Sequence, residues 1–128
     1  MKVLLDTHAF LWWIMDDPRL SATARAIIAD PDTVVHVSAA CAWEIAIKTS
    51  LEKLRLPQSP SSYIPAQMQI NGFNELAITV DHALHIHALP HHHRDPFDRI
   101  LVAQSQMEGI PLVSRDPLLG HYAVDLIW

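Results

Sequence analysis

The sequence predicts an α/β fold in which helices cover both faces of a parallel sheet. Short apolar runs rich in β-branched residues alternate along the chain with longer stretches of helical character. Strands that alternate with helices form βαβ units, which place helices on both faces of a parallel sheet. With 128 residues, the chain is long enough for one hydrophobic core, so we expect a single domain over residues 1–128.

The first part of the chain reads as a strand and two helices. KVLLD, at residues 2–6, is a short apolar run that ends in a carboxylate, and AFLWWIM, at residues 9–15, has the continuous apolarity of a buried helix. Ser21 precedes ATARAIIAD at residues 22–30, whose alanines and isoleucines favour a second helix that Pro31 ends.

The middle of the chain predicts a strand followed by two helices. TVVHVS, at residues 33–38, is rich in β-branched residues and is typical of a strand. Ser38 is placed to cap a long helix over residues 39–51. A proline-rich connector follows and leads into one more helix, which Gly72 ends.

The last part of the chain predicts three strands and two helices. ELAITV (75–80), IPLVS (110–114) and YAVDLIW (122–128) are strand-like, whereas DHALHIHAL (81–89) and DPFDRILVAQSQMEG (95–109) are helical. We therefore expect a central parallel sheet of four to five strands.

Composition excludes several classes of protein. The single cysteine, Cys41, cannot form an internal disulfide, and no cysteine and histidine spacing of a zinc finger is present, which fits a cytoplasmic protein. No apolar run approaches twenty residues, so we expect no membrane span. The net charge of −5 argues against a broad basic surface for nucleic acid.

Five carboxylates have positions that call for an explanation, either at an edge of the sheet where a ligand is expected to bind or inside an apolar helix. In an open parallel sheet, ligands bind at the carboxyl ends of the strands, where the strand order reverses. Four acids lie at predicted strand exits or helix starts, namely Asp6, Asp95, Asp98 and Asp116. Glu44 lies inside an otherwise apolar helix, where an unpaired carboxylate is costly to bury.

Each acid taken alone has a structural explanation. Asp95 can cap a helix that has Asp98 at its third position, and Asp6 and Asp116 can cap the segments that follow them. Glu44 can pair with a lysine one turn later. Taken singly, these explanations are favoured. The combination instead indicates a metal site, because clustered carboxylates repel one another unless a cation lies among them.

The ligand types indicate which metal and which reaction. Carboxylates without thiolates are hard ligands, which suit Mg²⁺ or Mn²⁺ rather than zinc. One or two such ions lower the pKa of a bound water and stabilise the charge that grows on a phosphate. The set therefore predicts phosphodiester hydrolysis, with one carboxylate orienting or deprotonating the water.

Four segments carry a family resemblance: LLDTHAFLW (4–12), VSAACAWEIAIK (37–48), DPFDRILVAQSQMEG (95–109) and LVSRD (112–116). In these segments the chain resembles PIN-domain ribonucleases, and most closely the toxins of VapBC-type toxin–antitoxin pairs. The resemblance spans Leu4 to Asp116 in the order and spacing of the family. It implies a three-layer α/β/α sandwich with a central parallel sheet and an acidic pocket that binds Mg²⁺ or Mn²⁺.

The resemblance also implies a role for individual residues. Four acids would hold the metal and carry the catalysis, and they are Asp6, Glu44, Asp98 and Asp116. Asp95 competes with Asp98 for the third position, but the interval from Asp98 to Gly109 fits the family better. Asp95 then becomes a helix cap that is accessory to the metal site. Thr7 resembles the hydroxyl that supports a ligand.

The resemblance implies single-stranded RNA as substrate, a cognate antitoxin as partner and a homodimer built through helices. Arg94, Arg99 and Arg115 lie beside the proposed ligands and are predicted to bind RNA phosphates, although salt bridges to neighbouring acids are an equal alternative. His91, His92 and His93 have no role in the resemblance, and three consecutive histidines point apart, which disfavours a zinc site.

Two other functions compete with the ribonuclease. One is a PIN fold that keeps its acids but serves as a binding or regulatory module. The other is a metal-dependent nuclease directed at DNA.

Overall fold

The computed structural model describes residues 1–128 and contains a five-stranded sheet in the order β3-β2-β1-β4-β5. All neighbouring strands are parallel. The strands are β1 (Lys2–Leu5), β2 (Val34–Ser38), β3 (Asn74–Leu76), β4 (Leu112–Val113) and β5 (Leu126–Ile127). Because β2 and β3 extend to one side of β1 and β4 and β5 to the other, the strand order reverses between β1 and β4.

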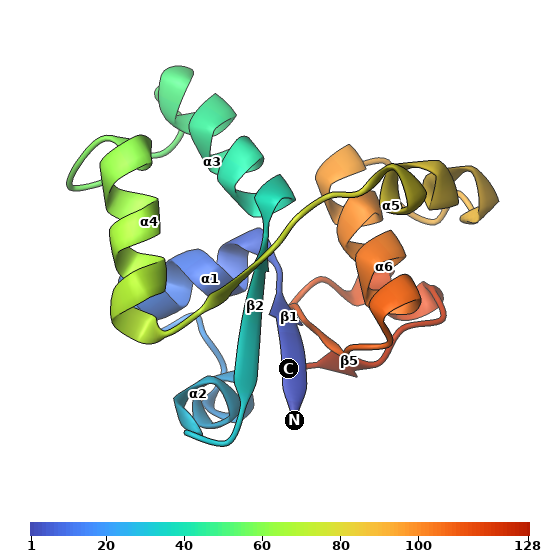
Figure 1. Cartoon of the computed structure of the whole chain (residues 1–128), viewed down its shortest axis with the longest axis horizontal. Coiled ribbons are helices and arrows are strands. Elements are labelled where there is room, and N and C mark those ends of the chain that lie inside the picture. The colour runs from blue at the N-terminus through green and yellow to red at the C-terminus, as the bar shows by residue number, and fades with distance from the viewer.

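Six α-helices and two 3₁₀ turns connect these strands. The helices are α1 (Thr7–Ile14), α2 (Ala22–Ala29), α3 (Ala39–Ser50), α4 (Pro60–Asn71), α5 (Val80–His85) and α6 (Pro96–Glu108), and the 3₁₀ turns are η1 (Ile86–Ala88) and η2 (Pro117–His121). In Figure 1, α1, α2 and α4 lie on one side of the sheet and α5 and α6 on the other. The predicted α/β/α sandwich with a parallel sheet is confirmed. None of these helices combines the length and the apolar character that crossing a membrane requires.

The central strand explains why the sheet forms. Val3, Leu4 and Leu5 of β1 are fully buried, as expected for a strand that has helices on both of its faces. Phe10 of α1 and Leu101 of α6 are also buried, and they belong to a single cluster of 27 buried apolar residues. This core fixes the two strands, β1 and β4, whose carboxyl ends carry the acids.

The edge strands are shorter than the sequence predicted. The expected strand at 75–80 ends at Leu76, because Thr79 instead caps α5 through a hydrogen bond from the N–H of His82. The expected strand at 122–128 is reduced to Leu126–Ile127, since its neighbour β4 offers only two paired residues. Both corrections concern the edges of the sheet and leave its centre unchanged.

Candidate active site

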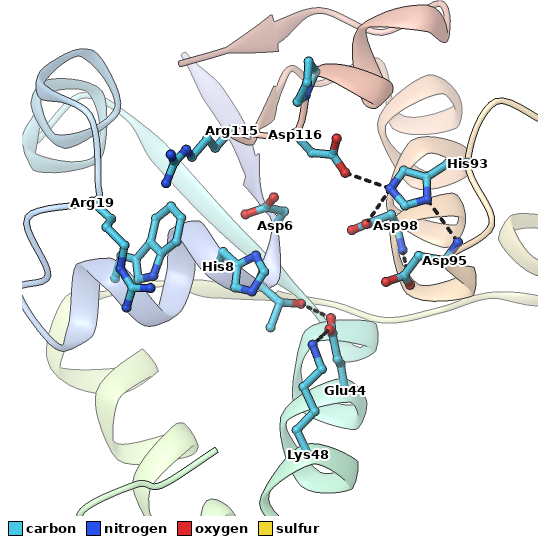
Figure 2. A pocket seen from close by; sticks show the side chains of 13 residues that line it. Asp6, His8, Arg19, Glu44, Lys48, His93, Asp95, Asp98, Arg115 and Asp116 are labelled. Atoms are coloured by element: carbon cyan, nitrogen blue, oxygen red, sulfur yellow. Dashed lines mark hydrogen bonds and ion pairs between the residues drawn. The ribbon is translucent and has the colours of Figure 1, made fainter. Parts of the chain in front are cut away.

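A cavity of about 540 Å³ opens at the carboxyl ends of β1 and β4, where the strand order reverses (Figure 2). All five acids that the sequence singled out line it. The lining residues are Asp6, Thr7, His8, Trp12, Arg19, Glu44, Lys48, His93, Asp95, Asp98, Arg115, Asp116 and Pro117. Residues that are up to 111 positions apart in the chain thus meet at one edge of the sheet.

Asp6 follows β1 directly and is only 5% exposed. Its Oδ1 accepts a hydrogen bond of 2.8 Å from the N–H of Ala9, so it caps α1 as the sequence allowed. Burial raises the pKa of Asp6, against the opposing effect of a hydrogen bond from the buried Ser114. Burial disfavours the ionised form of a carboxyl group, and a nearby cation stabilises that form.

Glu44 projects from α3 into the same cavity and is 4% exposed. The hydroxyl of Thr7 donates to its Oε1 at 2.6 Å, and the ammonium of Lys48, one helical turn later, pairs with Oε2. Both the supporting hydroxyl and the lysine pair that the sequence suggested are therefore present. Lys48 supplies the cation that this buried carboxylate needs.

Asp95 and Asp98, at the start of α6, have different roles. Oδ1 of Asp95 accepts hydrogen bonds from the N–H groups of Phe97 (2.8 Å) and Asp98 (3.3 Å), which makes Asp95 the helix cap. In a reciprocal capping box, the third helical residue would accept from the N–H of the cap. Here that N–H donates instead to Nδ1 of His93 at 3.0 Å. The carboxylate of Asp98 therefore takes no part in capping and lines the cavity.

Asp116 lies in the turn after β4, where it caps η2 by accepting from the N–H of Leu118 at 2.9 Å. Its other oxygen, Oδ2, is 2.7 Å from Nε2 of His93. The same nitrogen is 3.2 Å from Oδ2 of Asp98. His93 therefore bridges two carboxylates that come from different elements of the fold (Figure 2).

Electrostatics in the pocket favour an added positive charge. Burial raises the pKa of Asp98 to about 7, and the negative charges of Asp95, Asp6 and Glu44 add to this, while His93 opposes them. One polar atom each of His93, Asp98 and Asp116 lie within 4.8 Å of one another. The carboxylate oxygens gathered in the cavity, with no thiolate lining it, fit a hard divalent cation such as Mg²⁺ or Mn²⁺.

The wall of the pocket opposite His93 is basic and aromatic. The ring of His8 stacks on Trp12 with centroids 5.3 Å apart and an interplanar angle of 12°. The guanidinium carbons of Arg19 and Arg115 lie 5.1 Å and 5.9 Å from the centroid of Trp12. Cations thus gather on the wall that faces the carboxylates.

A family model described as PIN domain matches residues 3–124. The chain belongs to the PIN domain family.

Two relatives of this PIN domain are ribonucleases of Mycobacterium tuberculosis. Ribonuclease VapC22 is 31% identical over 121 residues, which are 94% of this chain and 91% of the relative. Ribonuclease VapC16 is 42% identical over 72 residues, which are 53% of this chain and about half, 51%, of the relative. Both are named ribonucleases.

A solved structure with the same fold is VapBC2 from Rickettsia felis, bound to a DNA fragment from its promoter. It superposes with a TM-score of 0.71 at 11% sequence identity, over 98% of this chain and 97% of the compared chain. At this identity the likeness concerns the fold alone, and it agrees with the three-layer PIN architecture.

Of the arginines predicted to bind RNA in this PIN domain, Arg115 alone lines the pocket. Arg99 does not line the pocket, and its contacts are within the fold. It is 8% exposed, and its guanidinium donates to the carbonyl oxygens of Pro90 (2.9 Å) and Ile86 (3.3 Å). Arg94 is exposed and lies outside the pocket lining.

Six lining residues of the PIN pocket were not assigned to it from the sequence: His8, Trp12, Arg19, Lys48, His93 and Pro117. Lys48 had a signal, its spacing of four residues from Glu44. His8 follows the Asp6-Thr7 pair directly, which places it at the pocket edge once α1 starts there. Arg19 and His93 lie in loops whose paths no periodic pattern reveals.

Proposed function

We propose that this PIN domain is a metal-dependent endoribonuclease that hydrolyses single-stranded regions of RNA, and that it is the toxin of a type II toxin–antitoxin pair. The observation that carries the proposal is the gathering of Asp6, Glu44, Asp98 and Asp116 around one cavity at the reversal of strand order. The match to ribonuclease VapC22 over 94% of the chain supports the choice of reaction.

The carboxylates have distinct duties in this proposal. Asp6, Glu44, Asp98 and Asp116 would hold Mg²⁺ or Mn²⁺, and the bound ion would lower the pKa of a water and stabilise charge on the phosphate. One of these carboxylates orients the attacking water. Thr7 and Lys48 hold both oxygens of Glu44 in place, while Asp95 fixes the start of α6 and stays accessory to the site.

We propose that the RNA strand binds along the basic and aromatic wall of the pocket. The guanidinium of Arg115 is placed to contact a phosphate, and Arg19 lies beside the same tryptophan. His8 is exposed and stacked on Trp12, so it offers a ring on which an unpaired base can stack. Arg94, outside the pocket, is proposed to contact the strand further along.

Two protein partners complete the proposal. The motifs shared with VapBC-type toxins support a cognate antitoxin that covers the pocket in the cytoplasm. We also propose a homodimer through helices, since Trp43 and Ile47 of α3 and Leu51, its C-cap, are exposed apolar residues spaced four apart. Analytical ultracentrifugation of the protein and of Trp43→Lys tests the dimer, and a monomeric wild type would refute it.

The proposed reaction is tested by cleavage of matched single-stranded RNA and DNA oligonucleotides. The metal-free protein should cleave neither, and Mn²⁺ should restore cleavage of RNA only. Asp6→Asn, which keeps the shape of the side chain, should abolish the restored activity. Binding of Mn²⁺ without any cleavage would favour the regulatory module, and preferential cleavage of DNA would favour the DNA-directed nuclease.

A further inference from the structure

One histidine of the HHH segment enters the pocket and the other two do not. The side chain of His93 is 13% exposed, and its Nε2 contacts Asp116 and Asp98 at 2.7 Å and 3.2 Å. His91 and His92 are exposed and do not line the cavity. The three consecutive histidines therefore do not act as a unit, and His93 needs an explanation of its own.

The hydrogen bond at the other ring nitrogen decides which nitrogen carries the proton. Nδ1 of His93 lies 3.0 Å from the backbone nitrogen of Asp95, whose N–H can only donate. Nδ1 must therefore present its lone pair, and in the neutral ring the hydrogen is on Nε2. The single hydrogen on Nε2 is then donated to Oδ2 of Asp116, while Oδ2 of Asp98 lies close to the same nitrogen at 3.2 Å.

This arrangement is the reverse of that in a metal-bound histidine. A histidine that ligates a metal uses the lone pair of one nitrogen and usually donates the N–H of the other to a carboxylate or a carbonyl. In His93 the nitrogen that faces away from the carboxylates accepts, and the nitrogen that faces them donates. The 2.7 Å contact to Asp116 is thus a hydrogen bond, the 3.2 Å contact to Asp98 is a close polar contact with the same N–H, and neither marks a third metal ligand.

Buried groups hold the backbone of the loop in place. The N–H of His93 donates to the hydroxyl of Tyr122 at 2.9 Å, and Tyr122 is 4% exposed. The guanidinium of Arg99 donates to the same hydroxyl at 3.2 Å and to the carbonyl of Pro90 at 2.9 Å. Such a satisfied polar network specifies one geometry, so the placement of the imidazole is built into the fold.

We propose that His93 is a positioning residue of the metal centre, which donates from Nε2 to Asp116 with Asp98 in close contact with the same nitrogen, and is not itself a metal ligand. This inference rests on the proposed metal-dependent function. The two carboxylates come from α6 and from the turn after β4, and their negative charges disfavour close approach. Their shared contact with Nε2 holds them together before an ion arrives, so less rearrangement accompanies metal binding.

Calorimetric titration with Mn²⁺ tests the positioning role. His93→Ala should weaken Mn²⁺ binding by about 10- to 100-fold, as is usual when a partner of a metal ligand is removed. His93→Gln should recover most of the affinity, because its side-chain amide can donate in place of Nε2. His91→Ala, in the same histidine segment but exposed and outside the cavity, is the matched control and should bind Mn²⁺ like the wild type.

Pulsed electron paramagnetic resonance on the Mn²⁺-loaded protein separates a positioning residue from a ligand. We expect the wild type and His93→Gln to show the same ¹⁴N couplings, because no imidazole of residue 93 touches the ion. A coupling that His93→Gln removes would overturn the proposal, as would equal affinity in the wild type and His93→Ala. This comparison needs only the glutamine variant, so it stands even if His93→Ala does not fold.

The two proposals fail in different ways. If the wild type binds no Mn²⁺ at all, the metal-dependent function fails and the role of His93 fails with it. If the wild type binds Mn²⁺ and cleaves RNA while His93→Ala binds it equally well, the role of His93 alone is refuted.

Discussion

Asp98→Asn is expected to reduce Mn²⁺-dependent RNA cleavage by more than about 100-fold. Loss of a residue that only supports a metal ligand usually reduces activity by about 10- to 100-fold, so a larger loss is expected for a ligand itself. The substitution keeps the size of the side chain and an oxygen that can stay in contact with Nε2 of His93, but it removes the negative charge from the pocket. Single-turnover cleavage at saturating RNA measures this loss, and calorimetry with Mn²⁺ shows whether metal affinity falls with it.

Asp95→Asn is the matched control, three residues earlier in the same turn. Asparagine caps a helix about as well as aspartate, so the hydrogen bonds to the N–H groups of Phe97 and Asp98 should persist. Most of the activity and of the stability should therefore remain. An equal loss of cleavage in the two variants would refute the division between Asp98 as metal ligand and Asp95 as helix cap.

The stability of metal-free Asp98→Asn provides a readout that is independent of activity. The pKa of Asp98 is about 7 in the folded protein, against 3.8 as the ordinary value, so the carboxyl group favours the folded state while it is protonated. This contribution is fully present below about pH 4 and is lost as the pH rises through about 7. At pH 8 without metal, Asp98→Asn should raise the free energy of unfolding by about 1–3 kcal/mol.

Urea unfolding at pH 8 and pH 4 measures this difference between the wild type and Asp98→Asn. The gain should be largest at pH 8 and should shrink toward pH 4. Added Mn²⁺ should reverse the order at pH 8, since the ion stabilises the wild type alone. A variant that is less stable than the metal-free wild type at pH 8 would contradict the picture of an electrostatically strained pocket.

Arg99→Met is expected to lower the free energy of unfolding by about 2–4 kcal/mol, because it removes the hydrogen bonds that a buried guanidinium makes to two carbonyl groups and to a buried hydroxyl. The guanidinium of Arg99 donates to Ile86, Pro90 and the hydroxyl of Tyr122, and the residue is 8% exposed. Methionine retains a long apolar stem, so the loss reports mainly on these hydrogen bonds. Urea unfolding at a pH where both variants are soluble measures it.

Arg94→Met is the control for Arg99, since Arg94 is an exposed arginine of the same segment. A surface substitution of this kind usually changes stability by less than about 0.5 kcal/mol. If Arg99→Met matched Arg94→Met in stability but bound RNA more weakly, Arg99 would be an RNA contact after all. The structural role given to its buried guanidinium would then be wrong.

The sequence was sufficient for the parts of the site that depend on the sheet. Asp6 and Asp116 each follow a strand, and parallel strands bring their carboxyl ends to one edge, so their meeting follows from the βαβ pattern. Glu44 was singled out because a carboxylate in an apolar helix needs a partner, and Lys48 at the next turn is that partner.

The parts that the sequence could not provide depend on how loops pack. The hydroxyl of Tyr122 accepts from the N–H of His93, and Arg99 donates to the carbonyl of Pro90, so these two residues fix the loop that brings His93 to the pocket. No local sequence pattern encodes these contacts. Arg99 was assigned to RNA because it adjoins Asp98 in the chain, yet its side chain points into the fold. The edge strand β3 was overestimated because capping of α5 by Thr79 replaces strand pairing there.

The central claim is that the cavity between the ends of β1 and β4 holds the divalent ion on which RNA cleavage depends. Anomalous scattering from crystals soaked in Mn²⁺, at a concentration that supports cleavage, tests it most directly. We predict a manganese peak in this cavity among the carboxylates of Asp6, Glu44, Asp98 and Asp116, with His93 still hydrogen-bonded to Asp116. A fully active protein whose only manganese peak lies outside the cavity would contradict it.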